Sequence, residues 1–452
     1  MYSSVLLQSR VASDCSDGMA LKRFWVRFRC TAFRAVILLF LAGYMLVTCY
    51  SSYFLIRRKY GDNDKSIKVV EKHNSYIEDD NEEWNPWGQE LENNQNAIPF
   101  EKAMLKWKAP KIKLHDVEIW GKAALGNYLW EHILNSTLKD QMGGIWRYGE
   151  TQYRNFKFRF RTGPGVIQSN VPWNVENLVL ALNGRTKDKI TYAKSWLDYL
   201  PNYKHLRHVA VVLLGDEKCN NDWFMPYLVK NGGRVDVAFI IYDIPEADND
   251  NIYQWPLGVA TYRDFPNFQP HQINYKATRP YICNYVATVY KNTSREVLMN
   301  MMTKNQLHHK CYIKPRLKWA AGETDETRNS YIKGLIESDL TLNPAGDNTE
   351  CYRMYEAMSV GSMPVIEDIM TKGRCGNSSV SHDAPVHLLK EFGAPVIFIK
   401  DWTELYDIFK TEGLFSSKGK IERRHKILEW YDLFKRKMRG RFLDALEQKF
   451  LR

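Results

Sequence analysis

The sequence predicts an α/β protein with two Rossmann-like domains, each built on a parallel sheet, followed by a helical extension. Short apolar runs at residues 178–182, 209–214 and 239–242 are separated by helical stretches, which is typical of a parallel sheet covered on both faces. A second alternation of strands and helices runs through residues 279–399. A chain of 452 residues is long enough for two such domains.

The first 111 residues lack this pattern and indicate a membrane anchor with a stem. Residues 35–56 are a mostly apolar run of about 22 residues, roughly 33 Å as a helix, which is enough to span a bilayer. Lys and Arg are more numerous before this run than after it, so we expect residues 1–34 in the cytosol and the rest in a lumen. Residues 57–111 are polar and acid-rich, as a stem would be. Three glycosylation sequons fit this single-pass type II orientation: Asn135, Asn292 and Asn377.

Net charge and cysteine content bear on what the protein binds and on its disulfide bonds. The formal charge of +11 does not indicate nucleic-acid binding, because the basic residues are spread along the chain without a recognisable nucleic-acid module. Five cysteines follow the apolar segment, and in an oxidising compartment an odd count permits two disulfides and one free thiol. Their spacing leaves the pairing open: Cys219, Cys283, Cys311, Cys351 and Cys375.

The first domain, residues 112–270, places acidic residues where its strands should end. Asp216 and Glu217 follow the strand predicted at 209–214, and Asp243 ends the next one. Carboxyl ends of parallel strands meet at one edge of a sheet, where ligands bind. These three residues are therefore unranked candidates for a catalytic base, although each alone is more often a turn or cap residue.

A strand near the start of this domain alternates phenylalanines with cations. Lys157, Arg159 and Arg161 share one face, because successive side chains of a strand point to opposite sides. One hypothesis is that they bind an anionic acceptor. The alternative is a solvated face on a strand whose other face is packed.

The second domain, residues 271–415, contains the most informative stretch. A strand at 339–342 is followed by turn residues, and Asp347 with Glu350 has capping-box spacing, so we expect a helix to begin at Asp347. Gly361 suits the left-handed position after its last turn, and a buried strand should follow at 363–366.

This predicted helix carries Arg353 and Glu356 on one side, together with Thr349 and Val360, while the other side faces a core. A helix amino terminus and a nearby guanidinium suit a diphosphate. The carboxylate of Glu356, roughly 4.5 Å further along the axis, suits the hydroxyls of a ribose. The alternative is an ordinary surface pair of Arg and Glu.

The same stretch resembles the nucleotide-sugar motif of exostosin-type glycosyltransferases. The resemblance rests on Pro344 and Gly346, on residues 351–357 and on residues 361–366. It implies that Arg353 contacts the diphosphate and Glu356 the ribose, and it departs from the family at Ala345, where exostosins usually have Arg. The donor-binding residues expected on this basis are Gly346, Asn348, Thr349, Arg353 and Glu356.

The resemblance also implies the GT-B arrangement, with the donor in the second domain, the acceptor in the first and a helical closure at residues 416–452. In an inverting enzyme of this kind, the base usually comes from the first domain. Asp248 and Asp250 match the D-x-D motif of metal-dependent transferases. Here, however, a Pro separates them from the end of the strand, so we interpret them as part of a polar loop. No cofactor beyond the sugar nucleotide, and no metal, is indicated.

A second resemblance covers the chain from residue 82 onward. Residues 82–87, 119–124, 254–263 and 348–353 are similar to Golgi xylosyltransferases that act on ribitol phosphate, as is the stretch 420–424. This implies UDP-xylose as donor, ribitol 5-phosphate on the O-mannosyl glycan of α-dystroglycan as acceptor, and a Golgi membrane location. It also implies association with fukutin-type ribitol-phosphate transferases.

The sequence is also compatible with two other functions. One is an exostosin-like transferase that uses a different UDP-sugar, because xylose differs from glucose by a single hydroxymethyl group. The other is a catalytically silent Golgi scaffold or lectin.

Overall fold

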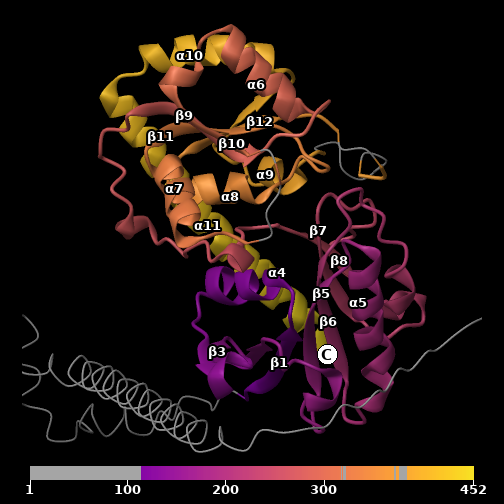
Figure 1. Ribbon diagram of the computed structural model, residues 1–452. Coiled ribbons are helices and arrows are strands. Elements are labelled where there is room, and N and C mark those ends of the chain that lie inside the picture. The colour runs from indigo at the N-terminus through magenta and orange to yellow at the C-terminus, as the bar shows by residue number, and fades with distance from the viewer. Residues whose placement is uncertain (1–112, 317, 319–321, 371–372, 376–383, 452) are drawn as a thin grey trace, which may run out of the picture. The chain divides into compact units, whose positions relative to one another are not determined.

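The computed structural model describes residues 113–316, 318, 322–370, 373–375 and 384–451, and all of them belong to one unit of the chain (Figure 1). The cytosolic tail, membrane segment and stem predicted at 1–111 lie outside the described residues. Within the described ranges, none of the helices combines the length and apolar character that crossing a bilayer requires.

The first domain is built on an eight-stranded sheet of order β2-β3-β4-β1-β5-β6-β7-β8. The strands from β4 to β8 run parallel, while β3 is antiparallel to both β4 and β2 at one edge. This confirms the predicted parallel α/β sheet. Its strands are β1 (His115–Gly121), β2 (Lys139–Gln141), β3 (Trp146–Tyr153), β4 (Phe156–Thr162), β5 (Asn177–Asn183), β6 (His208–Leu214), β7 (Val237–Ile241) and β8 (Ile252–Trp255).

The described helices of this domain cover its parallel part. The first crossover is a short α-helix that continues as a π-helix, and the second covers β5 and β6 from the other side. They are α4 (Ala124–Asn127), η1 (Tyr128–Ile133) and α5 (Lys187–Tyr199). Gly121 is required where β1 leaves the sheet, because a Cβ there would lie 2.2 Å from the carbonyl oxygen of Ala181.

The second domain is built on a five-stranded sheet, β10-β9-β11-β12-β13, in which every pair is parallel. Strands and helices alternate along the chain, which confirms the second α/β unit. The strands are β9 (Tyr281–Thr288), β10 (Cys311–Arg316), β11 (Ser338–Asn343), β12 (Met363–Glu367) and β13 (Ile397–Ile399). The helices are α6 (Ser294–Lys304), α7 (Asp325–Ile336), α8 (Tyr352–Ser359), α9 (His387–Glu391) and α10 (Leu405–Leu414).

Helix α8 begins later than the sequence predicts, at Tyr352 instead of beside Asp347. The capping-box prediction is wrong because Glu350 does not turn back to cap the helix. Its carboxylate instead accepts hydrogen bonds from the backbone N–H of Leu257, at 2.9 Å, and from the hydroxyl of Tyr355, at 2.5 Å. The chain bends at residues 347–349, and Cys351, the residue before the helix, is extended with a φ of −143°.

Burial does not distinguish the predicted ligand side of α8 from its predicted core side. Glu356 and Val360 are as buried as Met354 and Met358, because α7, α11 and the connection after β8 cover both sides of the helix. The glycine prediction is confirmed: Gly361 has a φ of +71° just after the helix.

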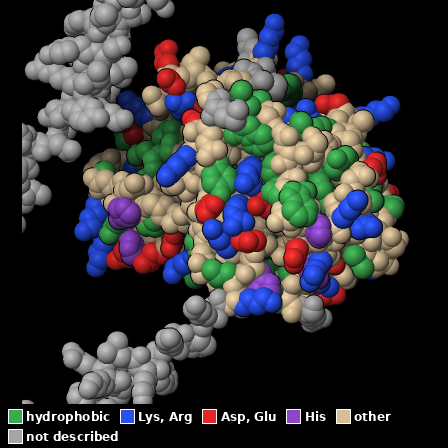
Figure 2. All heavy atoms as spheres, turned by 90° about the horizontal axis from the view of Figure 1, so that it is seen from below, with side chains coloured by type: hydrophobic (Ala, Val, Ile, Leu, Met, Phe, Trp, Pro, Cys, Tyr) green, Lys and Arg blue, Asp and Glu red, His purple; other side chains and the backbone are tan. Residues whose placement is uncertain are grey.

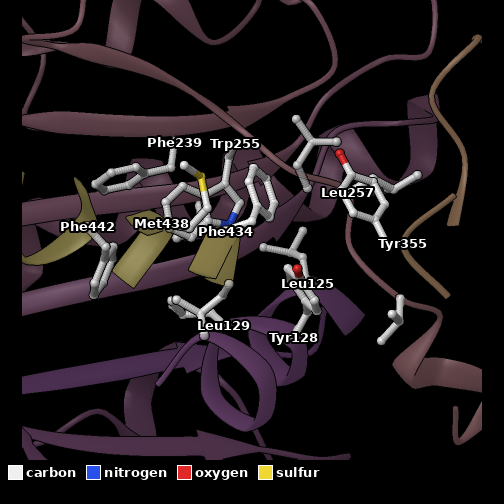
Figure 3. Close-up of a cluster of buried hydrophobic side chains, with 14 of the residues drawn as sticks. Leu125, Tyr128, Leu129, Phe239, Trp255, Leu257, Tyr355, Phe434, Met438 and Phe442 are labelled. Carbon is white, nitrogen blue, oxygen red and sulfur yellow. The ribbon is translucent and has the colours of Figure 1, made fainter. Parts of the chain in front are cut away.

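One long helix, α11 (Ser417–Phe450), takes the place of the predicted helical extension. Its apolar stripe is buried as its spacing predicts, including Ile427, Phe434 and Phe450. Figure 1 shows α11 running from the second domain to the first. Figure 3 shows its residues Met438 and Phe442 packed beside the sheet residues Phe239 and Trp255. This helix therefore gives the two sheets a shared core.

The start of α11 is anchored by a buried ion pair. Arg424 donates to one carboxylate oxygen of Asp339 at 2.9 and 2.7 Å, and also to the carbonyl oxygens of Tyr275 and Ala277 at 3.1 and 2.7 Å. Arg424 is 4% exposed and Asp339 is 3% exposed. The cluster joins β11, α11 and the connection between the domains.

Arg424→Met should therefore destabilise the protein by about 3–5 kcal/mol, because it leaves Asp339 charged and buried with Lys420 as a more distant partner. Urea unfolding followed by circular dichroism would measure this. Arg436→Ala, which removes an exposed pair with Asp432 on the same helix, should cost no more than about 1 kcal/mol. Equal losses in the two variants would contradict the prediction.

Candidate active site at the start of helix α8

The loop before α8 and the helix itself lie against the first domain and the connection that follows it. Asn348 donates from Nδ2 to the carbonyl oxygen of Glu217, at 2.8 Å. Glu350 accepts from the backbone N–H of Leu257, and Glu356 accepts from that of Ala260, at 3.0 Å. Polar groups from the carboxyl ends of both sheets therefore meet around one helix start.

The disulfides complete this junction. Cys219, in the loop after β6, is bonded to Cys375 of the second domain. The second bond joins Cys283 of β9 to its register partner Cys311 of β10. Cys351 is a free thiol at the start of α8. The sequence permitted two bonds and one free thiol, and only the structure shows which cysteines are paired.

Arg353, in the first turn of α8, is half-buried and faces the ends of β9 and β11. Its Nη1 lies 3.3 Å from Oδ1 of Asn343, and its guanidinium lies over the ring of Tyr285, 5.4 Å from the centroid. Its Nε is buried with no hydrogen-bond partner. Within the described residues Arg353 has no carboxylate at ion-pair distance, so its positive charge is available to an anion.

Glu356 is 4% exposed, and both of its oxygens already accept hydrogen bonds. One accepts from the backbone N–H of Ala260 and the other from the hydroxyl of Tyr331 on α7. Burial raises the pKa of this carboxyl above its ordinary value. In the structure as described, Glu356 therefore joins α8 to α7 and to the interdomain connection.

The other residues predicted to bind the donor share the loop before α8. Gly346 is exposed at its tip, and its N–H donates to the carbonyl oxygen of Asn348, at 3.1 Å. Asn348 and Thr349 are buried, and the hydroxyl of Thr349 donates to the carbonyl oxygen of Ile369. These three residues thus lie in the loop that leads into α8, and Arg353 and Glu356 lie on the helix itself.

The three candidate bases have different surroundings. Asp243 is buried and accepts three hydrogen bonds, from Nε2 of Gln254 at 2.8 Å and from the backbone N–H groups of Val386 and His387 at 2.9 and 3.0 Å. It therefore holds the segment that leads into α9. Asp216 accepts from the backbone N–H of Asn220, at 3.3 Å, within a turn.

Glu217 differs from both because its carboxylate pairs with the side chain of Arg185, in the loop after β5. Burial raises the pKa of Tyr352, the first residue of α8, and the positive charge of Arg185 opposes that rise. The charge of Arg185 therefore acts on the first residue of α8. Among the three candidates, the carboxylate of Glu217 pairs with an arginine, whereas that of Asp243 accepts three hydrogen bonds at the junction.

The cations proposed for acceptor binding, Lys157, Arg159 and Arg161, do lie on one face of β4, but the face is neutralised. Lys157 pairs with Glu150 at 3.1 Å, and Arg159 pairs with Asp116 at the same distance. Arg161 pairs with Glu118 and lies over the rings of Trp120 and Tyr148. This network favours the alternative, a solvated face on a packed strand. Figure 2 shows a similar mixture of Lys and Arg with Asp and Glu over one face of the molecule.

Two remaining sequence features have clear structural settings. Asn135 and Asn292 are exposed turn residues with φ values of +45° and +58°, whereas Asn377 lies outside the described residues. Asp248 closes a loop by accepting backbone hydrogen bonds from Asp250 and Ile252, at 3.0 and 2.8 Å. Across the described part of the chain, no three His, Cys, Asp or Glu residues are grouped to hold a metal ion.

Burial also raises the pKa of Glu350, to about 7. The folded protein then retains a proton that the unfolded chain loses above about pH 4.5, so stability should fall as the pH rises from about 4.5 to 7. At about 1.4 kcal/mol per pKa unit, the loss is on the order of 3 kcal/mol. Glu350→Gln should remove it.

Urea unfolding at several pH values from 4.5 to 8 would measure the difference between this variant and the parent protein. Glu429→Gln, at an exposed position of α11, is the matched control and should keep the parent pH dependence. A parallel pH profile for Glu350→Gln and the parent protein would refute the prediction.

Two parallel sheets, with polar residues from their carboxyl ends gathered around one helix start, define an α/β protein of the class that binds ligands beyond its strand ends. Family models described as RXYLT1 N-terminal domain and RXYLT1 C-terminal domain match residues 117–256 and 262–451. The chain belongs to the ribitol-5-phosphate xylosyltransferase 1 family.

Similar proteins carrying that name come from three vertebrates. The zebrafish (Danio rerio) protein is 42% identical over 93% of this chain and 98% of its own length. The human (Homo sapiens) protein is 46% identical over 82% and 85%, and the mouse (Mus musculus) protein 43% over 91% and 96%. Among solved structures, the catalytic domain of starch synthase IV from Arabidopsis thaliana covers 74% of this chain and 99% of its own, at 9% identity. Its TM-score is 0.37, too low to support any argument.

Proposed function

We propose that this protein is an inverting xylosyltransferase of the GT-B type, which moves xylose from UDP-xylose to ribitol 5-phosphate on the O-mannosyl glycan of α-dystroglycan. The names of its relatives support the activity. The observation that carries the proposal is the place of Arg353, in the first turn of α8 at the junction of two parallel sheets, with no carboxylate partner among the described residues.

In this proposal the second domain, residues 271–415, binds the donor. The free N–H groups at the start of α8 and the guanidinium of Arg353 stabilise the charge of the diphosphate as it leaves. Gly346 lets the backbone approach the phosphates, and Asn348 and Thr349 hold the loop in place. An ionised Glu356 has lone pairs left for a ribose hydroxyl beside its present partners. Because protein groups supply the positive charge, we propose no metal or other cofactor.

The first domain, residues 112–270, would bind the acceptor, and Glu217 is our choice of base. Its carboxylate takes the proton of the attacking hydroxyl, whose oxygen forms a bond to the anomeric carbon of xylose. The bond from that carbon to UDP breaks at the same time, and UDP leaves with the electron pair. Attack from the side opposite the leaving group inverts the configuration.

We also propose that the protein is a single-pass type II protein of the Golgi membrane, with tail, membrane segment and stem at 1–34, 35–56 and 57–111. The distribution of Lys and Arg in the sequence supports this orientation. The exposed positions of Asn135 and Asn292 are compatible with glycans. Fukutin-type ribitol-phosphate transferases are the proposed partners.

A donor screen with the full-length protein tests the function. We expect transfer to a synthetic ribitol-phosphate glycan with UDP-xylose, and much slower transfer with UDP-glucuronate or UDP-N-acetylglucosamine. Preference for either of those donors would replace our assignment with another exostosin-like activity. Absence of transfer from every UDP-sugar would favour a catalytically silent scaffold or lectin.

A further inference from the structure

A second arginine beside α8 lacks a carboxylate partner. Arg295, in the first turn of α6, is half-buried, and its Nη1 donates to the carbonyl oxygen of Thr288 at the end of β9, at 2.9 Å. Its Nε is buried and makes no hydrogen bond. Within the described residues no carboxylate lies at ion-pair distance from it. Holding an unpaired cation in such a place is costly unless an anion compensates it.

Two fully buried polar groups on the adjacent strands β9 and β11 are also unsatisfied. Tyr285 of β9 and Asn343 of β11 are each 0% exposed, and neither the hydroxyl of Tyr285 nor Nδ2 of Asn343 has a hydrogen-bond partner. Oδ1 of Asn343 is already used, since it accepts from the thiol of Cys351 at 2.8 Å and from Arg353. A buried donor without an acceptor costs about 1–3 kcal/mol, so such groups are rare unless a ligand uses them.

These groups converge on one place. The guanidinium of Arg353 lies over the ring of Tyr285, and the charges of Arg353 and Arg295 both oppose the rise that burial causes in the pKa of Tyr285. On the loop side, a Cβ added to Gly346 would lie 3.0 Å from Nη2 of Arg295. The two helix starts, the two guanidiniums and the unsatisfied donors therefore surround the carboxyl ends of the adjacent strands β9 and β11.

The geometry points to a diphosphate site that needs Arg295 as its second cation: Arg295 and the hydroxyl of Tyr285 bind the phosphates of the nucleoside diphosphate together with Arg353. Arg295 lies beside Gly346, next to Ala345, so it supplies from α6 a guanidinium that the loop itself lacks. The amide of Asn343 adds a neutral donor to the same site. This inference rests on the proposed use of a UDP-sugar and names the residues that hold it.

The test is calorimetric titration of the full-length protein with UDP, UMP and uridine. Arg295→Ala should weaken UDP binding about 10–100-fold, the effect of losing charge-assisted hydrogen bonds, and change uridine binding less than twofold. Arg295→Lys should recover part of the loss, because it restores the charge without the planar fork. Tyr285→Phe should weaken UDP binding about 5–10-fold, since it removes a single neutral donor.

Arg436→Ala, an exposed position on α11, is the control and should bind UDP like the parent protein.

If Arg295→Ala and Tyr285→Phe both bind UDP within twofold of a parent protein that itself binds UDP, this inference is overturned and the proposed function stands. If the parent protein binds no UDP and transfers no sugar, both are overturned. Equal loss of uridine and UDP binding in Arg295→Ala would also overturn it, because the effect would then not be at the phosphates.

Discussion

Arg353→Ala is expected to lower kcat/KM for xylosyl transfer from UDP-xylose by about 10²–10³-fold while the protein stays folded. The guanidinium belongs to the first turn of α8. Removing one such group from a leaving-group site has effects of this size. The side chain of Arg353 contacts Asn343, the sulfur of Cys351 and the ring of Tyr285, and none of these contacts is an ion pair, so the fold should tolerate its loss. Initial rates with a ribitol-phosphate acceptor measure the change.

Two companion variants make this result specific. Arg353→Lys keeps the charge and loses the planar fork, so its rate should lie between those of the parent and the alanine variant. Arg436→Ala removes an exposed arginine of α11 and should keep the parent rate. A rate within threefold of the parent for Arg353→Ala would remove the central support for a donor site at α8.

Glu217→Gln should lower kcat by about 10²–10⁴-fold, the range expected for loss of a general base, and leave UDP affinity within twofold. The amide cannot take the proton of the acceptor hydroxyl, but it has nearly the same size as the carboxylate. The link between the domains at this residue should survive, because it uses the backbone carbonyl oxygen that accepts from Asn348. Parallel measurements of kcat and of UDP binding separate the two effects.

The other acidic candidates serve as comparisons. Asp243→Asn should act mainly on stability, because Asp243 accepts three hydrogen bonds that hold residues 386–387 against the first domain. Asp216→Asn should have a small effect on both kcat and stability. A large kcat loss in Asp216→Asn with normal activity in Glu217→Gln would move the role of base to Asp216.

Several features of the fold were predictable because local sequence determines them. The apolar spacing of α11 describes a helix with one buried stripe, and the structure buries that stripe. The apolar runs that form β5, β6 and β7 predict strands covered on both faces, and none of the three is an edge strand of the sheet. Gly361 was predictable because few other residues accept a positive φ.

Other features depend on partners far away in the chain. Asp347 and Glu350 have the right spacing for a capping box. The carboxylate of Glu350, however, accepts hydrogen bonds from the backbone N–H of Leu257 and from the hydroxyl of Tyr355 instead. By sequence alone, the cations of β4 could form a binding face. In the structure, Asp116 and Glu118 of β1 and Glu150 of β3 form ion pairs with these cations. Strand β1 comes from much earlier in the chain, so the local sequence does not show that Asp116 and Glu118 lie beside these cations, whereas Glu150 comes from the adjoining hairpin strand.

The site was only partly visible in the sequence. Arg353 and Glu356 were found because they lie three residues apart on one helix and match a known motif. Arg295 and Tyr285, which we propose as further ligands of the diphosphate, belong to α6 and β9, well before that motif, and no local pattern marks them. The resemblance implies an Arg at position 345, where this chain has Ala, and that departure left one phosphate contact unassigned.

By itself, the sequence determined the two α/β domains, the closing helix and the helix that carries Arg353, because strand and helix periodicity and glycine stops act over a few residues. The tertiary structure alone decided where α8 starts, which cysteines pair, which acidic groups are already engaged, and which arginines keep an unneutralised charge. Those outcomes depend on which distant groups are brought within hydrogen-bond distance when β9 and β11 pair and the loops of the first domain close against α8.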